Sequence, residues 1–225
     1  MKSIAIIPAR GGSKGIPRKN IKLLNGKPLI TYTIKQALLA NFIDRVIVST
    51  DDMEIADISI NTGAEVIIRP KDISTDTSSS ELALLNVINY LEKEQQYKPD
   101  IITFLQCTSP LTNAEDIDGT IKLLIDKNLD TCFAVTKFDY FLWEEKNGEV
   151  IGINHDKSFR LMRQQRTSQF IETGAVYVMK TDGFLNKKFR FFGNMGYYIM
   201  PKERVLEIDE PIDFKIAELL IKENN

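Results

Sequence analysis

Short apolar runs alternate with longer amphipathic segments through the first two thirds of the chain. The apolar runs, such as residues 4–7, 45–50 and 101–105, are rich in β-branched side chains, which is typical of strands buried on both faces. The segments between them carry apolar residues at helical spacing. Repeated strand–helix units of this kind predict an α/β fold, in which helices flank a mostly parallel sheet.

The pattern assigns an order of elements along the chain. The predicted strands are residues 4–7, 45–50, 65–68, 101–105, 131–135 and 174–179. The predicted helices are residues 28–39, 51–61, 78–93, 112–126 and 211–222. Two of these helices are expected to begin with capping boxes, Ser78-x-x-Glu81 and Thr112-x-x-Glu115. Asp51 or Asp52 is expected to cap the second helix, and Gly63 to close it.

The rhythm changes in residues 138–170, which are aromatic, charged and irregular. Asn147-Gly148 is a strong signal for a two-residue hairpin turn. We therefore predict that this segment is a β-rich arm, inserted within a single domain that spans residues 1–225.

Composition narrows the classes of function. A net charge of −2 argues against a nucleic-acid or membrane surface, and no apolar run reaches membrane-spanning length. Cys107 and Cys132 lie in apolar runs, so we expect core thiols and a cytoplasmic protein. The single histidine, His155, lies in a polar stretch, which predicts a surface residue and excludes a histidine-based metal site.

Residues 8–20 combine three glycines with four cations directly after the first strand. Glycines let backbone N–H groups turn toward an anion, and guanidinium and ammonium groups bind phosphate. The segment matches neither the G-x-G-x-x-G dinucleotide motif nor the Walker motif. It is either a phosphate-binding loop or an ordinary basic turn. Ligands of parallel sheets bind beyond the carboxyl ends of strands, where residues 8–20, 49–52 and 106–112 all begin.

The motif PARGGSKG at residues 8–15, followed by P-x-K-N at residues 17–20, resembles the opening motif of the acylneuraminate cytidylyltransferases. The resemblance implies a Rossmann-like nucleotidyltransferase fold that binds CTP. It also implies that the triphosphate contacts a set of loop residues: Arg10, Gly11, Gly12, Ser13, Lys14, Lys19 and Asn20.

Two further motifs extend the resemblance toward the nucleotide base and the sugar. LQCTSPLT at residues 105–112 is similar to the family run LQPTSPLR, with Cys107 and Thr112 as departures. The resemblance implies that Gln106 contacts the sugar, and that Arg69 and Ser80 read the cytosine. Without it, residues 106–110 are only a strand-to-helix turn and Ser78 only a helix cap.

A carboxylate pair precedes the last helix. Glu207 and Asp209 are spaced to point the same way in an extended segment, so they can share one hard cation such as Mg²⁺. The alternative is a helix N-terminus enriched in acids, which accounts for Glu210 and Asp213. The family often has two aspartates where this chain has Glu207 and Asp209.

The remaining motifs are expected to surround a sugar acid. The pattern R-Q-Q at residues 163–165 with T-G-A-V-Y at residues 173–177 recurs in the family near the sugar. The resemblance implies sugar contacts by Gln164, Gln165 and Thr173, and by Phe191 and Phe192 from a partner subunit. Each phenylalanine reads equally well as a core or interface residue. The arm, residues 138–170, is implied to build a homodimer.

Together these motifs predict transfer of CMP from CTP to a 2-keto sugar acid of the sialic or legionaminic acid class. The expected catalytic residues are Lys19, Arg10 and Asp209, with Mg²⁺ as cofactor and pyrophosphate as leaving group. The alternatives are another nucleotide, another acceptor (pseudaminic acid, Kdo or a phosphonate), or a non-catalytic nucleotide-binding assembly protein. A dehydrogenase is disfavoured by the missing glycine motif.

Overall fold

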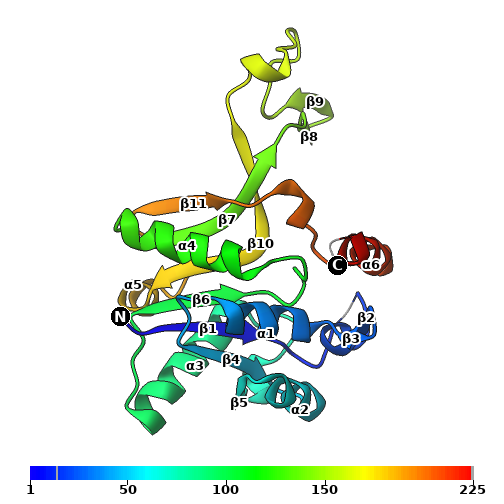
Figure 1. The fold of residues 1–225 in the computed structure, drawn as a ribbon. Coiled ribbons are helices and arrows are strands. Elements are labelled where there is room, and N and C mark those ends of the chain that lie inside the picture. Colours follow the sequence, from blue (N-terminus) through cyan, green and yellow to red (C-terminus); the bar gives the residue numbers. More distant parts are fainter. Residues whose placement is uncertain (14, 224–225) are drawn as a thin grey trace.

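The computed structural model describes residues 1–13 and 15–223, which form a seven-stranded central sheet (Figure 1). In spatial order the strands are β11 (Met195–Ile199), β7 (Thr131–Phe138), β10 (Gln169–Lys180), β6 (Ile101–Leu105), β1 (Ser3–Pro8), β4 (Arg45–Thr50) and β5 (Glu65–Ile68). Neighbouring strands are parallel, except that β10 runs antiparallel to both β6 and β7. The predicted α/β fold with a mostly parallel sheet is confirmed.

Helices cover both faces of this sheet. One face packs against α1 (Ile30–Leu39), α2 (Met53–Thr62) and α4 (Ala114–Asp126). The other packs against α3 (Ser80–Gln95) and α5 (Thr181–Lys187). Side chains of β1 alternate between the two cores, with Ala5 and Ile7 in one and Ile4 and Ile6 in the other. Because both faces are covered, this strand reads as a continuous apolar run.

A third, smaller core lies beyond the carboxyl ends of the parallel strands. Here α6 (Pro211–Glu223) packs beside the short hairpin of β2 (Leu23–Leu24) and β3 (Lys27–Pro28) (Figure 1). The cluster joins the loop after β1 to the last segment of the chain through Ile16, Leu24, Leu29, Ile208, Phe214 and Ala217. Burial of apolar side chains in this way contributes about 1.5–3 kcal/mol each.

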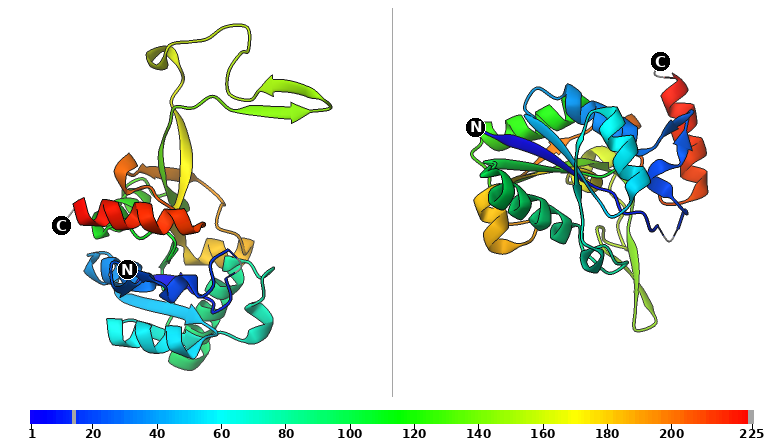
Figure 2. Two further views of the ribbon diagram at one scale, coloured as in Figure 1. Left: turned by 90° about the vertical axis from the view of Figure 1, so that its right-hand side faces the viewer. Right: turned by 90° about the horizontal axis from the view of Figure 1, so that it is seen from below.

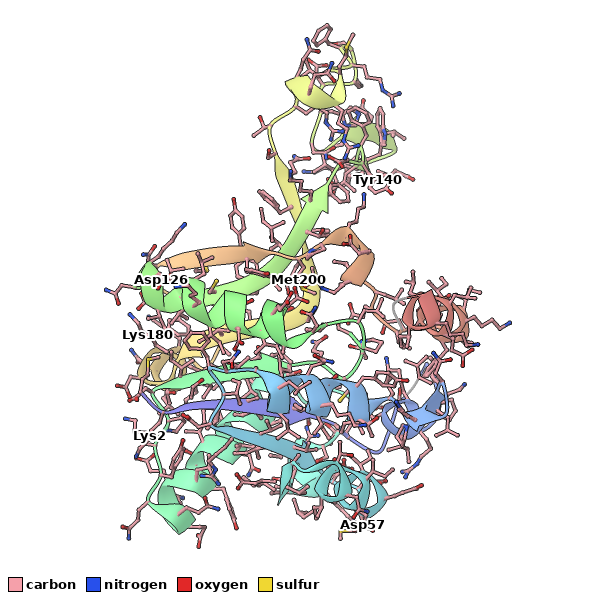
Figure 3. The ribbon with its side chains drawn as sticks, in the orientation of Figure 1. Lys2, Asp57, Asp126, Tyr140, Lys180 and Met200 are labelled. Atoms are coloured by element: carbon pink, nitrogen blue, oxygen red, sulfur yellow. The ribbon has the colours of Figure 1, made fainter. Side chains whose placement is uncertain are left out.

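The chain between β7 and β10 projects from the body as an arm (Figures 1 and 2). It contains a separate hairpin of β8 (Trp143–Lys146) and β9 (Glu149–Gly152). The turn lies at Asn147 and Gly148, which have φ values of 55° and 81°, as the Asn-Gly signal predicts. Figure 3 contrasts the two environments: Met200 is 1% exposed in the body, whereas Tyr140 is 64% exposed where the arm begins.

Several local predictions are wrong by one or two residues. The capping box of α4 is formed by Asn113 with Asp116, so Thr112 lies before the cap. Helix α3 begins at Ser80, and the Ser78 hydroxyl instead accepts a hydrogen bond from the Thr75 backbone N–H. In both cases several neighbouring polar residues can cap a helix, and tertiary packing selects among them. The Asp52 cap of α2 and its end at Gly63 are confirmed.

Other residues test the predictions about single side chains. Cys107 and Cys132 are buried, as predicted, and burial raises the pKa of their thiols to about 12 and about 11. The surface prediction for His155 is wrong, because its ring is half-buried between Phe141 and Trp143, with centroids 4.6 Å from each. Among the helices within residues 1–13 and 15–223, none has an apolar stretch long enough to span a bilayer.

Candidate active site

The loop after β1 is held by one hydrogen bond to β4 and by a second within the loop itself. Ala9 donates its backbone N–H to the Ser49 carbonyl on β4, at 2.9 Å. The Asn20 side-chain amide donates to the Arg10 carbonyl, at 3.0 Å. Arg18 adopts a left-handed conformation with φ 57°, and a short 3₁₀ helix, Lys19–Ile21, follows. This turn brings Lys19 back beneath the loop.

A cavity of about 300 Å³ lies against this loop at the carboxyl ends of the parallel strands. Its lining comes from the loop, the end of β5 and the start of α3: Pro8, Arg10, Gly12, Ser13, Lys19, Asn20, Arg69, Asp76, Ser78, Ser79 and Ser80. The structure therefore brings together the predicted nucleotide-binding residues, with two exceptions. Gly11 is not among the lining residues, and Lys14 lies outside the described part of the chain.

Carboxylates on neighbouring elements hold the loop in place. Gly11 donates its backbone N–H to the Asp51 carboxylate at 3.0 Å, so this donor faces β4 and not the cavity. A methyl group added at Gly11 would lie 2.6 Å from a carboxylate oxygen of Asp52, which explains the glycine at this position. Arg10 pairs with Asp76 at 2.9 Å and donates to the Thr75 carbonyl at 2.8 Å.

Arg18 is held by the first turn of α2. Its guanidinium binds the carboxylates of Asp52 and Glu54. The hydrogen bond from Arg18 holds the pKa of Asp52 below its usual value, and the bond to Asp52 raises the pKa of Arg18. This cation of the loop therefore stabilises the loop conformation and is turned away from the cavity toward α2.

Arg69 is buried in the cavity wall, with 5% of its surface exposed. Its guanidinium donates to the Ser49 carbonyl at 3.3 Å, while its Nε has no partner among the described residues. Burial lowers the pKa of Arg69, the largest of the effects on it. Leaving a buried donor unpaired costs about 1–3 kcal/mol of stability. A ligand with a hydrogen-bond acceptor would recover this cost by binding to the Arg69 guanidinium.

The second wall of the site comes from the segment before α6, which packs directly on the loop. Lys19 donates its ammonium to the Ile208 carbonyl at 2.8 Å and pairs with the Asp209 carboxylate at 3.2 Å. A methyl group at Gly15 would lie 3.1 Å from the Asp209 carbonyl oxygen, so the two segments are in close contact. The Lys19 side chain is 15% exposed and that of Asp209 is 68% exposed.

Glu207 lies beside the end of β6. Its carboxylate accepts from the Thr108 hydroxyl at 3.4 Å and from the Gln106 amide at 3.2 Å, with that amide oriented to donate also to the Gly174 carbonyl at 2.9 Å. Partial burial, and then the negative charge of Asp209, raise the pKa of Glu207. A carboxylate whose ionisation is disfavoured by a second carboxylate nearby favours a cation between the two.

The carboxylate pair fits Mg²⁺ by its chemistry. Both residues offer hard oxygen atoms, and Mg²⁺ typically takes one or two protein carboxylates and completes its coordination with phosphates and water. Within residues 1–13 and 15–223, three or more His, Cys, Asp or Glu side chains do not converge into a complete metal site. An ion held here would therefore take its remaining ligands from a bound phosphate and from water.

The predicted sugar-binding residues are only partly assembled within one chain. Gln106 lies at the site, beside Glu207. Thr173 is buried and donates its hydroxyl to the Ala134 carbonyl at 3.1 Å, so this hydroxyl is used within the sheet. Gln164 and Gln165 lie in the arm, in the 3₁₀ helix Arg163–Gln165, and the structure does not bring them to Gln106.

The aromatic pair also lies away from the loop. Phe191 packs edge-on against Phe133, with centroids 5.1 Å apart, and against Tyr177, at 6.1 Å. Phe191 and Phe192 are both partly buried beside the core that α3 and α5 cover. Within a single chain they therefore have the packing role that the sequence left open as an alternative.

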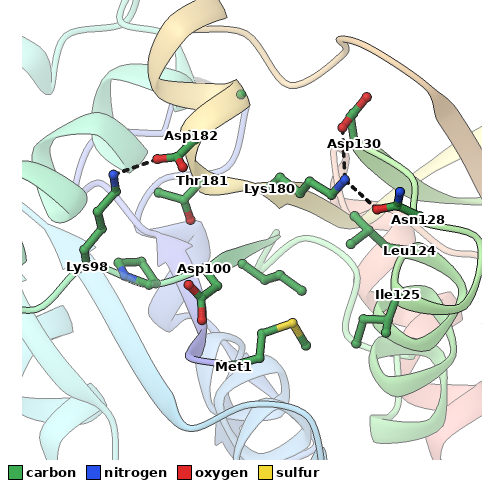
Figure 4. A pocket seen from close by; sticks show the side chains of 13 residues that line it. Met1, Lys98, Asp100, Leu124, Ile125, Asn128, Asp130, Lys180, Thr181 and Asp182 are labelled. Carbon is green, nitrogen blue, oxygen red and sulfur yellow. Dashed lines mark hydrogen bonds and ion pairs between the residues drawn. The ribbon is translucent and has the colours of Figure 1, made fainter.

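Larger cavities exist elsewhere on the molecule. One of about 740 Å³ lies at the opposite end of the sheet, between β10, α4 and the start of α5 (Figure 4). Its two lysines are both paired, Lys98 with Asp182 at 2.7 Å and Lys180 with Asp130 at 3.2 Å. It lacks the convergent cations and glycines of the loop after β1, so size alone does not identify the site.

Some residues that shape the site were not expected from the sequence. Asp51 and Asp76 hold Gly11 and Arg10, and Glu172 lies on β10 two residues from Gly174, which packs beside Glu207. Asp51 could have been found, because it follows directly on the buried strand 45–50 at the predicted ligand-binding edge. Asp76 and Glu172 carry no comparable local signal.

Comparison with known proteins agrees with this geometry. A family model described as Cytidylyltransferase matches residues 4–225. Pseudaminic acid cytidylyltransferase of Campylobacter jejuni is 34% identical over 230 aligned positions, covering 100% of this chain and 98% of that protein. N-acylneuraminate cytidylyltransferase A of Danio rerio is 35% identical over 95% of this chain, which corresponds to 49% of that longer protein.

Solved structures share the fold at low sequence identity. A CMP:2-keto-3-deoxy-manno-octonic acid synthetase complexed with CTP superimposes with a TM-score of 0.74 at 16% identity, over 100% of both chains. A 4-diphosphocytidyl-2C-methyl-D-erythritol synthase of Anaerococcus prevotii gives a TM-score of 0.68 at 13% identity, over 98% of both chains. These are nucleotidyltransferases with a Rossmann-like fold.

A family match along nearly the whole chain and the shared fold define an enzyme of the nucleotidyltransferase class. The chain belongs to the cytidylyltransferase family, and its predicted resemblance to the acylneuraminate enzymes is confirmed.

Proposed function

We propose that the protein transfers CMP from CTP to the anomeric hydroxyl of a nine-carbon 2-keto sugar acid and releases pyrophosphate. One observation carries this proposal: Lys19 lines the cavity under the loop and also pairs with Asp209, two residues from Glu207. A group held by Lys19 would therefore lie where a nucleotide cavity meets a carboxylate wall, which is the arrangement that phosphoryl transfer to an incoming hydroxyl requires.

The cavity supports a division of the nucleotide between two sets of residues. Arg69 has an unused donor and lines the same cavity as Ser80 at the N-terminus of α3, so these two would read the cytosine edge. The loop would hold the triphosphate, with Arg10 and Lys14 on the departing pyrophosphate. Gly12 and Ser13 line the same cavity, where backbone N–H groups can bind phosphate oxygens.

Lys19 would stabilise the charge that develops on the α-phosphate during in-line attack. Its ammonium is fixed by the Ile208 carbonyl, so it is already oriented before substrate binds. Preorganised donors of this kind contribute most to catalysis, because they need no rearrangement as charge develops.

Glu207 and Asp209 would hold Mg²⁺ against the phosphates. When bound, this ion would neutralise phosphate charge and lower the pKa of an attacking hydroxyl. Asp209 has the more exposed carboxylate, with 68% of its side chain accessible, and would receive the hydroxyl proton directly or through water. Glu207 is held by Thr108 and Gln106 and would keep the pair in position.

The acceptor is proposed to be a sialic or legionaminic acid. Support comes from the similarity to N-acylneuraminate cytidylyltransferases, including 30% identity to the enzyme of Escherichia coli over 100% of this chain. Pseudaminic acid is the second candidate, because the Campylobacter jejuni enzyme named for it is 34% identical at full length.

We also propose that the enzyme works as a homodimer built by the arm. An isolated two-stranded hairpin has little stability in water, yet β8 and β9 pair with each other and not with the main sheet among the described residues. Trp143, Phe159 and Met162 of the arm are 52%, 65% and 64% exposed. A partner subunit would cover these side chains and would receive Gln164 and Gln165.

The test is pyrophosphate release by the purified protein with CTP and Mg²⁺. The acceptor panel contains N-acetylneuraminic, legionaminic and pseudaminic acids, with eight-carbon Kdo as the shorter control. We expect release with at least one nine-carbon acid, and not when CTP is replaced by UTP or GTP. Absence of release with every acid would refute the proposed function. Light scattering on the same sample, with and without residues 140–168 replaced by a short linker, tests the homodimer.

A further inference from the structure

Strand β10 changes partners at an irregularity beside the proposed sugar site. From Val176 to Lys180 it pairs with β6, and Tyr177 to Met179 of this stretch also pair with β7, whereas from Gln169 to Glu172 it pairs with β7 alone. The register with β7 shifts between Glu172 and Tyr177, and Gly174 within this stretch has φ 69°. Such bulges re-aim side chains and often lie next to active sites. Here the bulge lies beside the end of β6, where the Gln106 backbone N–H donates to the Ala175 carbonyl at 3.4 Å.

The bulge is in contact with residues of the proposed site. The Gly174 carbonyl accepts a hydrogen bond from Gln106 at 2.9 Å. A methyl group at Gly174 would lie 3.1 Å from a carboxylate oxygen of Glu207 and 3.3 Å from the Gln106 amide. The glycine thus allows three elements to converge on one place, beside the carboxylate pair and the end of the nucleotide cavity.

Glu172 stands at the far end of the bulge, and its position is fixed from behind. Its carboxylate accepts a hydrogen bond from the Tyr177 hydroxyl. Tyr177 is 2% exposed, stacks on Phe104 with centroids 5.3 Å apart, and lies under the Arg190 guanidinium at 4.7 Å. A buried, stacked phenol is a rigid anchor, so it orients the Glu172 side chain, although the residue itself is exposed.

Glu172 lies on β10 two residues before Gly174, the residue that packs against both Glu207 and Gln106. Within the described chain, Glu172 does not join Glu207 and Asp209 in a three-residue metal cluster. Its exposed carboxylate is instead available as a hydrogen-bond acceptor for a ligand bound beside Gln106.

We propose that Glu172 determines acceptor specificity, by accepting a hydrogen bond from a hydroxyl or acylamino N–H of the sugar acid bound beside Gln106. This inference rests on the proposed function. An ionised carboxylate accepts hydrogen bonds and donates none, so it selects a donor on the sugar. It also repels the carboxylate of the substrate, which fixes which end of the sugar faces β10.

The experiment measures kcat, and KM for the sugar acid and for CTP separately, in wild type and in Glu172→Ala and Glu172→Gln. We expect Glu172→Ala to raise KM for the sugar acid by about tenfold or more, because hydrogen bonds to charged groups are among the stronger ones. Glu172→Gln retains one acceptor oxygen and should show a smaller rise. KM for CTP should stay within about twofold of wild type in both. Glu94→Gln, an exposed change on α3, is the matched control.

A purely structural role for Glu172 predicts a different pattern. Tyr177→Phe removes the hydroxyl that Glu172 binds and leaves the ring. If Glu172 serves only to hold Tyr177, the Glu172 variants and Tyr177→Phe should lower the melting temperature alike and leave both KM values unchanged. Under our proposal, an acceptor analogue that lacks the recognised donor gives the same KM with wild type and Glu172→Ala, as in a double-mutant cycle.

The outcomes separate the two proposals. If wild type releases pyrophosphate and the Glu172 variants keep the wild-type KM for the sugar acid, the specificity role is overturned and the proposed function stands. If wild type releases no pyrophosphate with any acid of the panel, both are overturned. A rise in KM for the sugar acid alone, abolished by removing one donor from the acceptor, establishes the role of Glu172.

Discussion

The ammonium group of Lys19 lies 3.2 Å from the carboxylate of Asp209, although 190 residues of chain separate them. This contact joins the loop after β1 to the segment before α6. The loop brings glycines and cations, and the later segment brings the carboxylate pair. Neither segment alone could both bind a triphosphate and hold a cation against it.

We expect Lys19→Ala to lower kcat by about 10²-fold or more, with a small change in melting temperature. The reason is that the variant removes one preorganised charge from the transition state. Steady-state kinetics with CTP and the preferred sugar acid provides the measurement, and Lys35→Ala, on the exposed side of α1, is the control. An unchanged kcat would remove Lys19 from the mechanism.

Glu207→Gln should raise the Mg²⁺ concentration needed for half-maximal activity by about tenfold, because it removes one charge from a two-carboxylate pair. Glu210→Gln is the matched control. It lies three residues further on, where its N–H is bound to Asp213 at the start of α6, and its Mg²⁺ dependence should equal that of wild type. The measurement is activity as a function of added Mg²⁺, after EDTA has removed the metal already bound and has itself been removed. Equal shifts for both variants would count against Glu207 as a ligand.

Gly174→Ala should lower both stability and activity. Forcing alanine to φ 69° costs about 1–2 kcal/mol, and the added methyl group would press on Glu207 and Gln106. Gly26→Ala separates the two effects, because Gly26 has φ 74° and open space around it. We expect both variants to lose stability in urea unfolding, but only Gly174→Ala to lose kcat/KM. A similar loss of activity in Gly26→Ala would contradict this account.

Asp52→Asn isolates the ion pair of the loop, since asparagine caps α2 as well as aspartate does. Arg18 holds the pKa of Asp52 below its usual value of about 4, so the ionised form is favoured by folding. The stabilisation is therefore complete above the unfolded pKa and is lost as the pH falls through the folded one. We expect Asp52→Asn to cost about 1 kcal/mol at pH 7 and progressively less as the pH falls through the folded pKa of Asp52. Urea unfolding at pH 7 and at lower pH values measures it, and a constant difference would contradict the prediction.

Arg190→Met should destabilise the fold by about 3 kcal/mol, because it leaves the Glu81 carboxylate buried without its partner. The pair lies 2.7 Å apart, with side chains 16% and 7% exposed. Adding Glu81→Met should restore most of the loss, since the buried charge is then gone. Lys122→Met breaks the exposed pair with Asp126 and should cost less than about 0.5 kcal/mol. Calorimetry measures the stability of each variant. A double variant no more stable than Arg190→Met would contradict the prediction.

The buried strands were predictable because burial on both faces makes them continuously apolar, and β1, β4 and β6 read clearly. A continuously apolar run does not show in which direction a strand runs, so nothing in residues 174–179 indicates that β10 is antiparallel to its neighbours. Strand β11 was missed because Met195, Tyr197 and Ile199 are about half exposed at the sheet edge and the run contains a glycine. Short elements such as α5 depend on tertiary packing and leave weak local patterns.

For the site, spacing predicted which segments meet but not which atoms remain available. The loop, Arg69 and Ser80 line one cavity, as their motifs indicated. The Gly11 N–H and the Thr173 hydroxyl are instead used by Asp51 and by the Ala134 carbonyl. Such pairings depend on distances between elements that are far apart in sequence, and a motif carries no record of them.

The third core, which joins the loop after β1 to α6, can be completed only after the last segment of the chain has been synthesised. Ile16, from the loop, is 2% exposed in a cluster that includes Ile208 and the first turns of α6. Domains fold from the N-terminus as they leave the ribosome, so the body can form while the loop still lacks this support. A chain that stalls before α6 would thus hold a folded sheet with an unfinished loop and no carboxylate wall. Such a product would carry exposed apolar surface for chaperones or proteases to recognise.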